Sequence, residues 1–314
     1  MIVHHIDPVI GEVGGVYLWW YGLSYTLGFF EVFLWFRSQR HRLGFSLAEV
    51  YDISILLAGC VVIGGRAVEV IFYEWPYYSQ HPQQIPWIWL GGMSTHGLLL
   101  GGAIGTAIFC RIHGRPFLAI ADELVIPGAF LMGTGRIGNF IDGQIVGSVT
   151  SMPWGVKFPD AEGFRHPVVL YDAFKNLLLV LVLLAIRRRN PKPGVVLANF
   201  IFWYAFLRIF VDIFREYPTR LFGLATGQSL NLFMSALGLA LWVWFASRGA
   251  PATSPARTAG VGGAPLWPRR LAFGLILAVC LTMPSDWTQD IPKRYGKRHP
   301  GLHYSKIYPP IASA

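Results

Sequence analysis

Several arginines and carboxylates of this chain stand inside apolar runs, where a charged side chain costs roughly 3 kcal/mol unless it is paired or hydrated. Arg208 and Asp212 are four residues apart, so they share one face of a helix. Arg66 and Glu69 are three residues apart and share a face in the same way. These pairs indicate either structural ion pairs that hold helices together or a polar site that holds an anion.

An excess of arginine favours the anion site. The face of Arg208 also carries Arg215, so two arginines accompany the single carboxylate of Asp212. Another arginine, Arg136, stands in a glycine-rich, partly apolar segment. Arginine stays charged, and its planar fork donates two parallel hydrogen bonds to a phosphate. We therefore predict that these arginines bind a phospholipid head group at the depth of the outer leaflet.

One histidine, His96, could act as a base. It lies in the glycine-rich stretch Gly91–Gly102, GGMSTHGLLLGG, at the outer end of an apolar run. Imidazole accepts a proton near neutral pH. A lone histidine in a membrane helix serves as a simple hydrogen-bond partner about as often. Its place beside glycines, which allow close approach of the backbone to a ligand or another helix, favours the catalytic interpretation.

Membrane-spanning helices are the elements that must position these residues. Of the 314 residues, 54% are hydrophobic and 14% are charged, whereas soluble domains carry about 25% charged residues. A span requires about 20 mostly apolar residues. The predicted spans are Val16–Phe36, Val50–Tyr73, His96–Arg111, Leu118–Gly133, Val168–Ile186, Val195–Phe214, Gln228–Ala246 and the marginal run Leu271–Met283. The third and fourth are short and rich in glycine, which predicts tilted, broken or partly re-entrant helices.

Basic residues occupy every second loop, as in RSQRHR after the first span and RRRNPKPG after the fifth. By the positive-inside rule these loops face the cytoplasm. The N-terminus and the loops Glu74–Thr95 and Gly135–Pro167 are then extracytoplasmic. The sequence thus predicts an all-α integral membrane protein with seven to eight transmembrane helices, an extracytoplasmic N-terminus and a glycine-rich polar cavity open to the outer leaflet.

The chain is predicted to have three parts. Residues 1–248 form a core of seven helices, and 249–266 form a flexible linker rich in Ala, Pro and Gly. Residues 267–314 contain an eighth helix and an extracytoplasmic tail. The three cysteines, Cys60, Cys110 and Cys280, are far apart in apolar segments, which is typical of inert buried thiols.

A set of motifs resembles the prolipoprotein diacylglyceryl transferase family over about residues 7–246. In chain order the motifs are DPVI (Asp7–Ile10), WYGLSYTLGF (Trp20–Phe29), GGR (Gly64–Arg66), GGMSTHG, GRIGNFIDG, RHP with LY in Arg165–Phe174, LRIFVDIFREYP (Leu207–Pro218) and GQSLNLFM (Gly227–Met234). The GRIGNF motif is highly specific. Members of this family move the diacylglyceryl group of phosphatidylglycerol to the cysteine thiol of a prolipoprotein.

The resemblance implies roles for individual residues. The implied catalytic residues are His96, Arg136, Arg208 and Tyr21. The implied substrate-binding residues are Asn139, Gly147, Arg66, Asp142, Gln144 and Asp212. It implies phosphatidylglycerol, the lipobox segment of a prolipoprotein signal peptide and membrane lipids as partners, and no metal, cofactor or nucleic acid. The expected location is the bacterial cytoplasmic (inner) membrane, with a multi-pass chain and the active site towards the extracytoplasmic leaflet.

The chain departs from the family pattern at the site itself. The departures are Leu90, Leu98, Asp142, Gln144, Ser148, Val168, Val169, Asp172 and Asp212. Gln144 replaces a glutamate and so removes a possible base, whereas Asp142 restores a carboxylate two residues away. Two alternatives therefore stay open: a relative with the same lipid donor and a different acceptor, and a catalytically inactive phospholipid-binding membrane protein.

Overall fold

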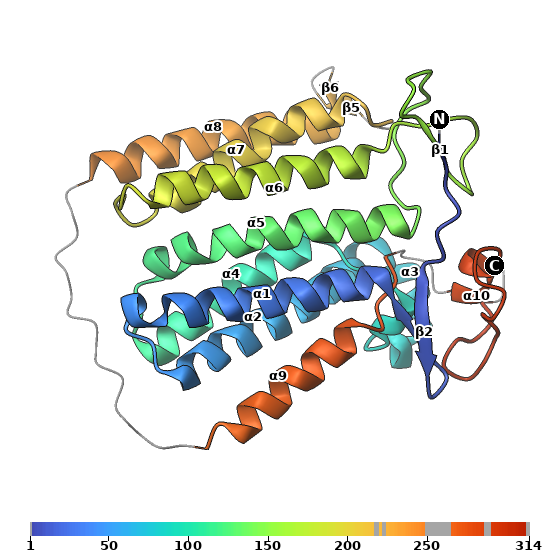
Figure 1. The fold of residues 1–314 in the computed structure, drawn as a ribbon, viewed down its shortest axis with the longest axis horizontal. Helices are drawn as coiled ribbons and strands as arrows, with labels where there is room; N and C mark the ends of the chain where they lie inside the picture. The colour runs from blue at the N-terminus through green and yellow to red at the C-terminus, as the bar shows by residue number, and fades with distance from the viewer. Residues whose placement is uncertain (1, 217–219, 222–223, 249–264, 286–289, 312–314) are drawn as a thin grey trace. The chain divides into compact units, whose positions relative to one another are not determined.

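The computed structural model describes residues 2–216, 220–221, 224–248, 265–285 and 290–311, and these are mainly helical (Figure 1). The chain divides into two compact units. Unit 1 contains residues 1–4 and 116–256, and unit 2 contains residues 5–115 and 257–314. Residues 249–264, which make up most of the predicted linker, lie outside the described part of the chain.

Unit 1 is built on α5 (Phe117–Ile141), α6 (Val168–Arg187), α7 (Val195–Asp212) and α8 (Thr226–Ser247). Helices α5 and α6, α6 and α7, and α7 and α8 pack side by side (Figure 1). A short parallel pair joins β1 (Ile2–Val3) to β4 (Val156–Lys157), and an antiparallel pair joins β5 (Arg220–Leu221) to β6 (Leu224–Ala225). The first pair holds the N-terminus against the long segment between α5 and α6.

Unit 2 is built on α1 (Trp20–Leu43), α2 (Leu47–Val68), α4 (Thr95–His113) and α9 (Trp267–Cys280). A π-helix, η1 (Glu69–Tyr73), continues α2. An antiparallel hairpin of β2 (Val9–Val13) and β3 (Val16–Trp19) precedes α1. The short helices are α3 (Trp75–Tyr78), η2 (Pro82–Gln84), η3 (Ile88–Leu90) and α10 (Ile291–Tyr295).

Six helices in the described part of the chain are long and apolar enough to cross a membrane. They are Leu47–Tyr73, Thr95–His113, Phe117–Ile141, Val168–Arg187, Val195–Asp212 and Gly227–Ser247. The predicted all-α membrane fold is therefore confirmed. Helix α1, with 24 residues, is not among these six helices, and α9, with 14 residues, is shorter than the about 20 that a bilayer core requires. The membrane crossings of α1 and α9 thus stay predictions.

Three details of the predicted spans were wrong. Val16–Trp19 is a strand of the N-terminal hairpin, so the first helix begins at Trp20. The fourth run does not end at Gly133, because α5 continues to Ile141 and places Arg136 inside the helix. The third and fourth helices are continuous, with 19 and 25 residues, so the predicted break is wrong, whereas the predicted tilt stays a prediction. Gly97, Gly101 and Gly105 of the third helix serve close helix packing, which hydropathy alone does not distinguish from a break.

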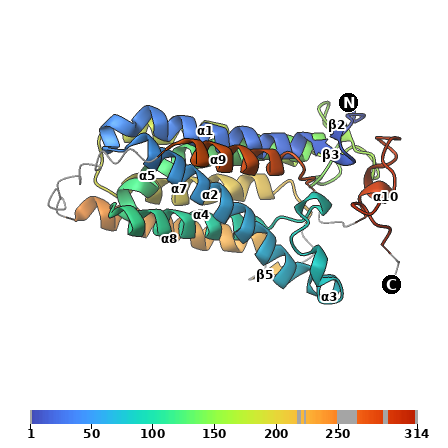
Figure 2. The same cartoon turned by 90° about the horizontal axis from the view of Figure 1, so that it is seen from below.

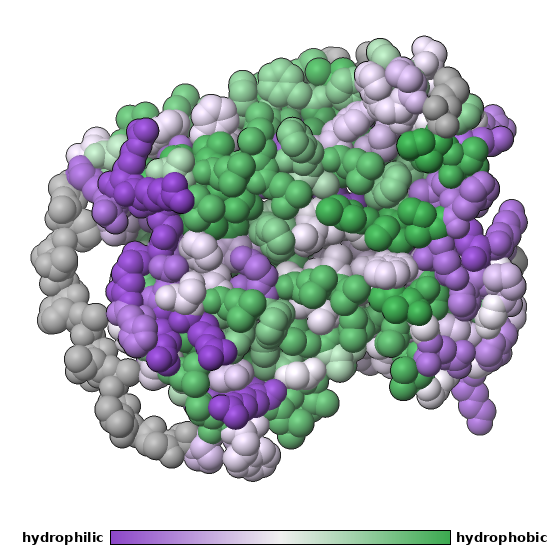
Figure 3. All heavy atoms as spheres, viewed as in Figure 1, coloured by the Kyte–Doolittle hydropathy of each residue, from purple (hydrophilic) through white to green (hydrophobic). Residues whose placement is uncertain are grey.

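The helices expose large apolar side chains along their length. Phe174 on α6 is 70% exposed and Phe233 on α8 is 69% exposed, and Leu181 and Val243 are similarly exposed. In Figure 3 apolar side chains extend over the helices, whereas hydrophilic ones gather near helix ends. An apolar surface of this extent fits a lipid environment. Helices can lie in lipid because their backbone groups are hydrogen-bonded within the helix.

Glycines bring α2 and α4 into backbone contact. A Cβ atom at Gly97 would lie 2.2 Å from the carbonyl oxygen of Gly64, and one at Gly101 would lie 2.1 Å from that of Cys60. Gly105 completes a four-residue repeat and faces Leu56. Small residues at this spacing allow membrane helices to approach closely. The packing fixes the start of α4, where His96 stands.

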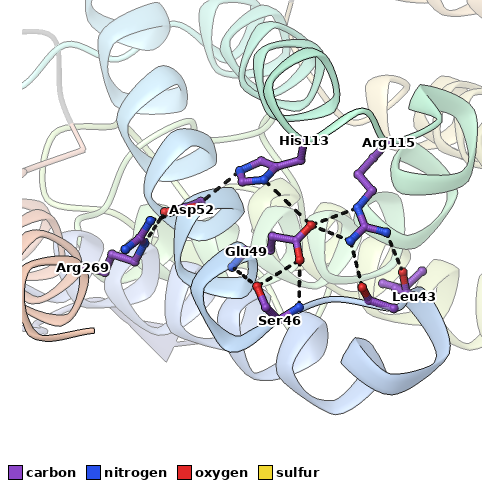
Figure 4. Close-up of polar contacts among 8 residues, drawn as sticks. Leu43, Ser46, Glu49, Asp52, His113, Arg115 and Arg269 are labelled. Carbon is purple, nitrogen blue, oxygen red and sulfur yellow. Dashed lines mark hydrogen bonds and ion pairs between the residues drawn. The ribbon is translucent and has the colours of Figure 1, made fainter. Parts of the chain in front are cut away.

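One end of α2 is tied to α4 and α9 by ion pairs (Figure 4). Glu49 forms a capping box with Ser46 and also accepts from Arg115, whose Nη2 lies 2.6 Å from Oε1. Asp52 pairs with Arg269 of α9, at 2.7 Å between Nε and Oδ1, and lies 3.5 Å from Nε2 of His113. These basic residues therefore hold the helices together, besides their predicted role in topology.

The C-terminal region is an integral part of unit 2. Helix α9 lies beside α1 (Figure 2), and a Cβ atom at Gly22 would lie 2.4 Å from the carbonyl oxygen of Cys280. The residues that follow α9 pack on the N-terminal hairpin in a cluster of buried aromatic and aliphatic side chains. Its buried members are Val9, Tyr17, Trp19, Leu90, Ile291, Tyr295, Leu302 and Tyr308. The predicted tail thus covers the hairpin that leads into α1.

The docking of this tail is expected to depend on pH. The hydroxyl oxygen of buried Tyr308 accepts from the backbone N–H of Tyr17 at 3.1 Å, and burial raises the pKa of Tyr308 to about 12. The unfolded value is about 10, so the stabilisation is complete below pH 10 and is lost as the pH rises through 12. We expect the tail to become protease-sensitive above pH 10, with a loss of up to about 2 kcal/mol.

The measurement is limited proteolysis of the purified protein between pH 8 and pH 11.5, with the cleavage sites mapped by mass spectrometry. Tyr308→Phe is the control, because it lacks the titrating hydroxyl and should show a weaker dependence. The pKa of neighbouring Tyr17 is also raised by burial, so a residual dependence remains. A tail that is equally resistant at both ends of the range would contradict the prediction.

Candidate active site

Asp172, a buried carboxylate on α6 in unit 1, forms ion pairs with three basic side chains. Oδ2 of Asp172 lies 2.7 Å from Nε of Arg136 on α5 and also pairs with Nη1 of Arg208 on α7. Oδ1 lies 3.0 Å from Nζ of Lys175, one turn further along α6. Asp172 is 1% exposed. One acidic side chain therefore orients two arginines that are 72 residues apart in the sequence, since both pair with the same oxygen.

A second carboxylate completes the arrangement. Nε of Arg208 lies 2.9 Å from Oδ1 of Asp212, and Nδ2 of Asn231 on α8 donates to Oδ2 at 2.9 Å. The predicted Arg208–Asp212 pair is thus present. Within the ion pairs of the described residues, Arg136, Lys175 and Arg208 give three positive charges against the two negative charges of Asp172 and Asp212, which is one positive charge in excess. Because an uncompensated buried charge is strongly unfavourable, the cluster is suited to receive an anion.

Asn139 lies on the same helix as Arg136, and its Oδ1 accepts from Nη1 of Arg136 at 3.2 Å. Its side chain is buried. The spacing of three residues makes this contact along one face of α5. Asn139 therefore contributes to the orientation of the guanidinium group, in addition to any contact with a head group.

At Gly147, in the segment after α5, two backbone carbonyl groups approach so closely that only a glycine fits. A Cβ atom there would lie 2.6 Å from the carbonyl oxygen of His166 and 2.7 Å from that of Phe214. Asp142, fully buried, follows the end of α5, and the N–H of Gln144 donates to the carbonyl oxygen of Asn139 at 2.9 Å. This segment therefore connects the end of α5 to the residues just before α6 and just after α7.

Arg66, in unit 2, is bound by the loop that precedes α4. Its Nε donates to the carbonyl oxygen of Ile85 at 2.7 Å, and its Nη1 donates to that of Gly91. Its Nη2 donates to the hydroxyl of Tyr78 at 2.8 Å and to the carbonyl oxygen of Gln84. Each guanidinium nitrogen thus has a partner inside the loop. These contacts give Arg66 a part in the folding of the loop, and its predicted contact with the substrate stays a prediction.

Tyr21 and His96 also belong to unit 2. The hydroxyl of buried Tyr21 donates to that of Tyr25 at 3.0 Å. His96 is the second residue of α4 and its side chain is exposed. The structure brings together Arg136, Asn139, Arg208 and Asp212 within unit 1, and the joint action of Tyr21 and His96 with them stays a prediction.

The sequence interpretation missed two members of the charged cluster. Asp172 was noted only as a departure from a motif, and Lys175 was not singled out. Their signal was the spacing of three residues inside an apolar run, the same signal that identified Arg66 and Glu69. In the part of the chain that the structure describes, no group of three or more His, Cys, Asp or Glu side chains is placed to hold a metal ion.

Comparison with known proteins points in one direction. The family model of prolipoprotein diacylglyceryl transferase matches residues 8–244. A phosphatidylglycerol–prolipoprotein diacylglyceryl transferase of Geobacter sulfurreducens is 39% identical over 252 residues, which cover 78% of this chain and 97% of the relative. The enzyme of the same name from Desulfotalea psychrophila is 38% identical over 254 residues, 76% of this chain and 93% of the relative. The C-terminal region that covers the hairpin follows the matched residues.

Proposed function

Because the chain belongs to the prolipoprotein diacylglyceryl transferase family, we propose that it transfers the diacylglyceryl group of phosphatidylglycerol to the lipobox cysteine of a prolipoprotein. The thiol sulfur attacks the glyceryl carbon that carries the phosphate ester. The carbon–oxygen bond breaks, a thioether forms and glycerol phosphate leaves. The thiol proton passes to a base.

The observation that carries the proposal is the excess positive charge of the cluster around Asp172. Negative charge grows on the phosphate as it departs, and preorganised cations stabilise that charge in a low-dielectric site. Arg136 and Arg208 supply guanidinium groups from two helices, already oriented by one carboxylate. They need little reorganisation during the reaction, which is the condition for efficient electrostatic stabilisation.

The placement of the cluster supports a site in the extracytoplasmic leaflet of the bacterial cytoplasmic membrane. Asp172 is near the start of α6, and Arg208 is near the end of α7. The opposite end of α6 carries Arg187, and the basic residues up to Lys192 follow it. Since basic loops face the cytoplasm, the cluster lies at the ends of the helices away from it.

The test is transfer by purified protein in vesicles that contain phosphatidylglycerol, with a synthetic lipobox peptide as acceptor. We expect the peptide to gain the mass of a diacylglyceryl thioether, and glycerol phosphate to be released in equal amount. A peptide whose cysteine is replaced by serine is the matched control. Tight binding of the lipid without any thioether would instead support the inactive lipid-binding alternative.

The same assay tests His96 as the base. The thiolate is the nucleophile, and a free cysteine has a pKa of about 8.5. His96→Gln should lower transfer about 100-fold at pH 7, and the loss should shrink as the pH passes 8.5 and the thiol ionises unaided. His113→Gln is the control, because His113 is the last residue of the same helix. A loss that is equal at all pH values would exclude His96 as the base.

A further inference from the structure

Polar atoms without hydrogen-bond partners extend inward along α6 from Asp172. Among the described residues, neither Nδ2 nor Oδ1 of Asn176 has a partner, although the residue is 1% exposed. Nζ of Lys175, at 5% exposure, also lacks one. Its contact with Oδ1 of Asp172 at 3.0 Å is an ion pair without the geometry of a hydrogen bond. Buried groups of this kind are rare, and each calls for a bound molecule or water.

These side chains are placed on the face that carries the arginine-binding carboxylate. Asn176 follows Asp172 by four residues, so the two share a helix face about 6 Å apart along the axis. Lys175 is held towards α7 as well, because its Nζ lies 3.8 Å from the centroid of the Tyr204 ring. The unpartnered atoms thus begin where the contacts of Arg136 and Arg208 end, one helical turn deeper.

The chemistry of these atoms suits a polyol. The Asn176 amide offers two donors and one acceptor, and the Lys175 ammonium offers three donors. An ionised phosphate oxygen only accepts hydrogen bonds. It therefore could not bond to Oδ1 of Asn176, which is also an acceptor. A hydroxyl both donates and accepts, and neighbouring hydroxyls can meet the two ends of one amide.

We propose that Asn176 and Lys175 form a subsite for the free glycerol of the phosphatidylglycerol head group. This inference rests on the proposed function, in which Arg136 and Arg208 hold the adjoining phosphate. The subsite selects phosphatidylglycerol over phosphatidic acid, an anionic lipid that carries the phosphate and lacks the second glycerol. Lys175 also balances Asp172, so that the carboxylate orients the arginines without cancelling their charge.

The test measures lipid affinity without any acceptor. Full-length protein is delipidated in detergent, and its dissociation constants for phosphatidylglycerol and phosphatidic acid with the same acyl chains are measured by native mass spectrometry. We expect wild-type protein to prefer phosphatidylglycerol at least about tenfold, since one net hydrogen bond corresponds to about that factor. Asn176→Leu, similar in shape, should weaken phosphatidylglycerol binding about tenfold and change phosphatidic acid binding less than about twofold.

Asn199 on α7 provides the matched control. It is fully buried, its Oδ1 lacks a partner among the described residues, and its Nδ2 donates to the carbonyl oxygen of Val195. It precedes Arg208 by nine residues, about 14 Å along the helix. Asn199→Leu should therefore keep the lipid preference, whereas Lys175→Met should reduce it.

The outcomes are decisive for the subsite. Equal wild-type affinity for the two lipids overturns it. An equal fall of both affinities in Asn176→Leu would indicate a structural role of Asn176 and would also overturn the subsite. Unchanged affinities in that variant would mean that only water occupies the site, which overturns the subsite too. A preserved preference for phosphatidylglycerol without thioether formation would contradict the proposed function and leave the subsite standing.

Discussion

Replacement of Arg208 by methionine is expected to lower diacylglyceryl transfer about 1000-fold, the loss seen when a preorganised partner of a developing negative charge is removed. Arg208 contacts both carboxylates of the cluster, Asp172 and Asp212. Its loss changes the charge of the cluster from one positive to zero. The leaving phosphate then meets no excess positive charge, and Asp172 is held by fewer cations.

Arg208→Lys should lie between the wild type and the methionine variant, because lysine keeps the charge without the fork that donates two parallel hydrogen bonds. Arg187→Met is the matched control. Arg187 ends α6 and its Nε lies 2.9 Å from Oε1 of Glu123 on α5, so the substitution removes an ion pair of similar kind away from the cluster. The measurement is transfer rate per folded protein, with folding checked by size-exclusion chromatography.

Two results would contradict this role of Arg208. One is a folded Arg208→Met protein that retains more than about a third of the wild-type rate, because removal of a group that stabilises the transition state lowers the rate far more than that. The other is an equal loss in Arg187→Met, which would mean that both arginines act through the stability of unit 1.

Gly101→Ala is expected to destabilise the protein by about 1–3 kcal/mol, the usual penalty for an added methyl group in a close-packed contact. The new Cβ atom would lie 2.1 Å from the carbonyl oxygen of Cys60 and 2.7 Å from its carbonyl carbon. Both are backbone atoms of α2, so the clash cannot be relieved by a side-chain rotation. The two helices must separate, and the start of α4 with His96 moves with them.

The neighbouring glycine is the control for this substitution. A Cβ atom at Gly102 meets only Cγ2 of Val61, at the ordinary distance of 3.8 Å. Alanine also favours a helix over glycine by about 1 kcal/mol, so Gly102→Ala should be neutral or stabilising. Thermal unfolding followed by tryptophan fluorescence in detergent compares the two. Equal melting temperatures would show that α2 and α4 are not in backbone contact.

The C-terminal region gives unit 2 a feature beyond the residues that match the family. It places a folded cap on the hairpin that leads into α1, and α9 contacts α1 beside Tyr21, at Gly22. Removal of the region would expose Trp19 and Tyr17, which are 0% and 1% exposed. The cap is thus a structural part of the unit that carries Tyr21.

The amino-acid sequence by itself determined the membrane class, most helix positions and the family. Hydropathy is a local property, so runs such as Val168–Ile186 and Val195–Phe214 coincide closely with α6 and α7. Motifs are local as well. The pair Arg208 and Asp212 could be predicted because both members stand on one helix, at a spacing that places them on one face.

Only the tertiary structure decided the partners of residues on different elements. Asp172 pairs with Arg136 and with Arg208, each 36 residues away in the sequence and each on another helix. Arg66 donates to carbonyl groups of a loop, and no sequence pattern specifies where those groups lie. The tail packs on the N-terminal hairpin, where Tyr308 contacts Tyr17 although the two are 291 residues apart in the sequence. Charge and burial energies depend on distance in space, and a sequence specifies that distance only within a single helix or strand.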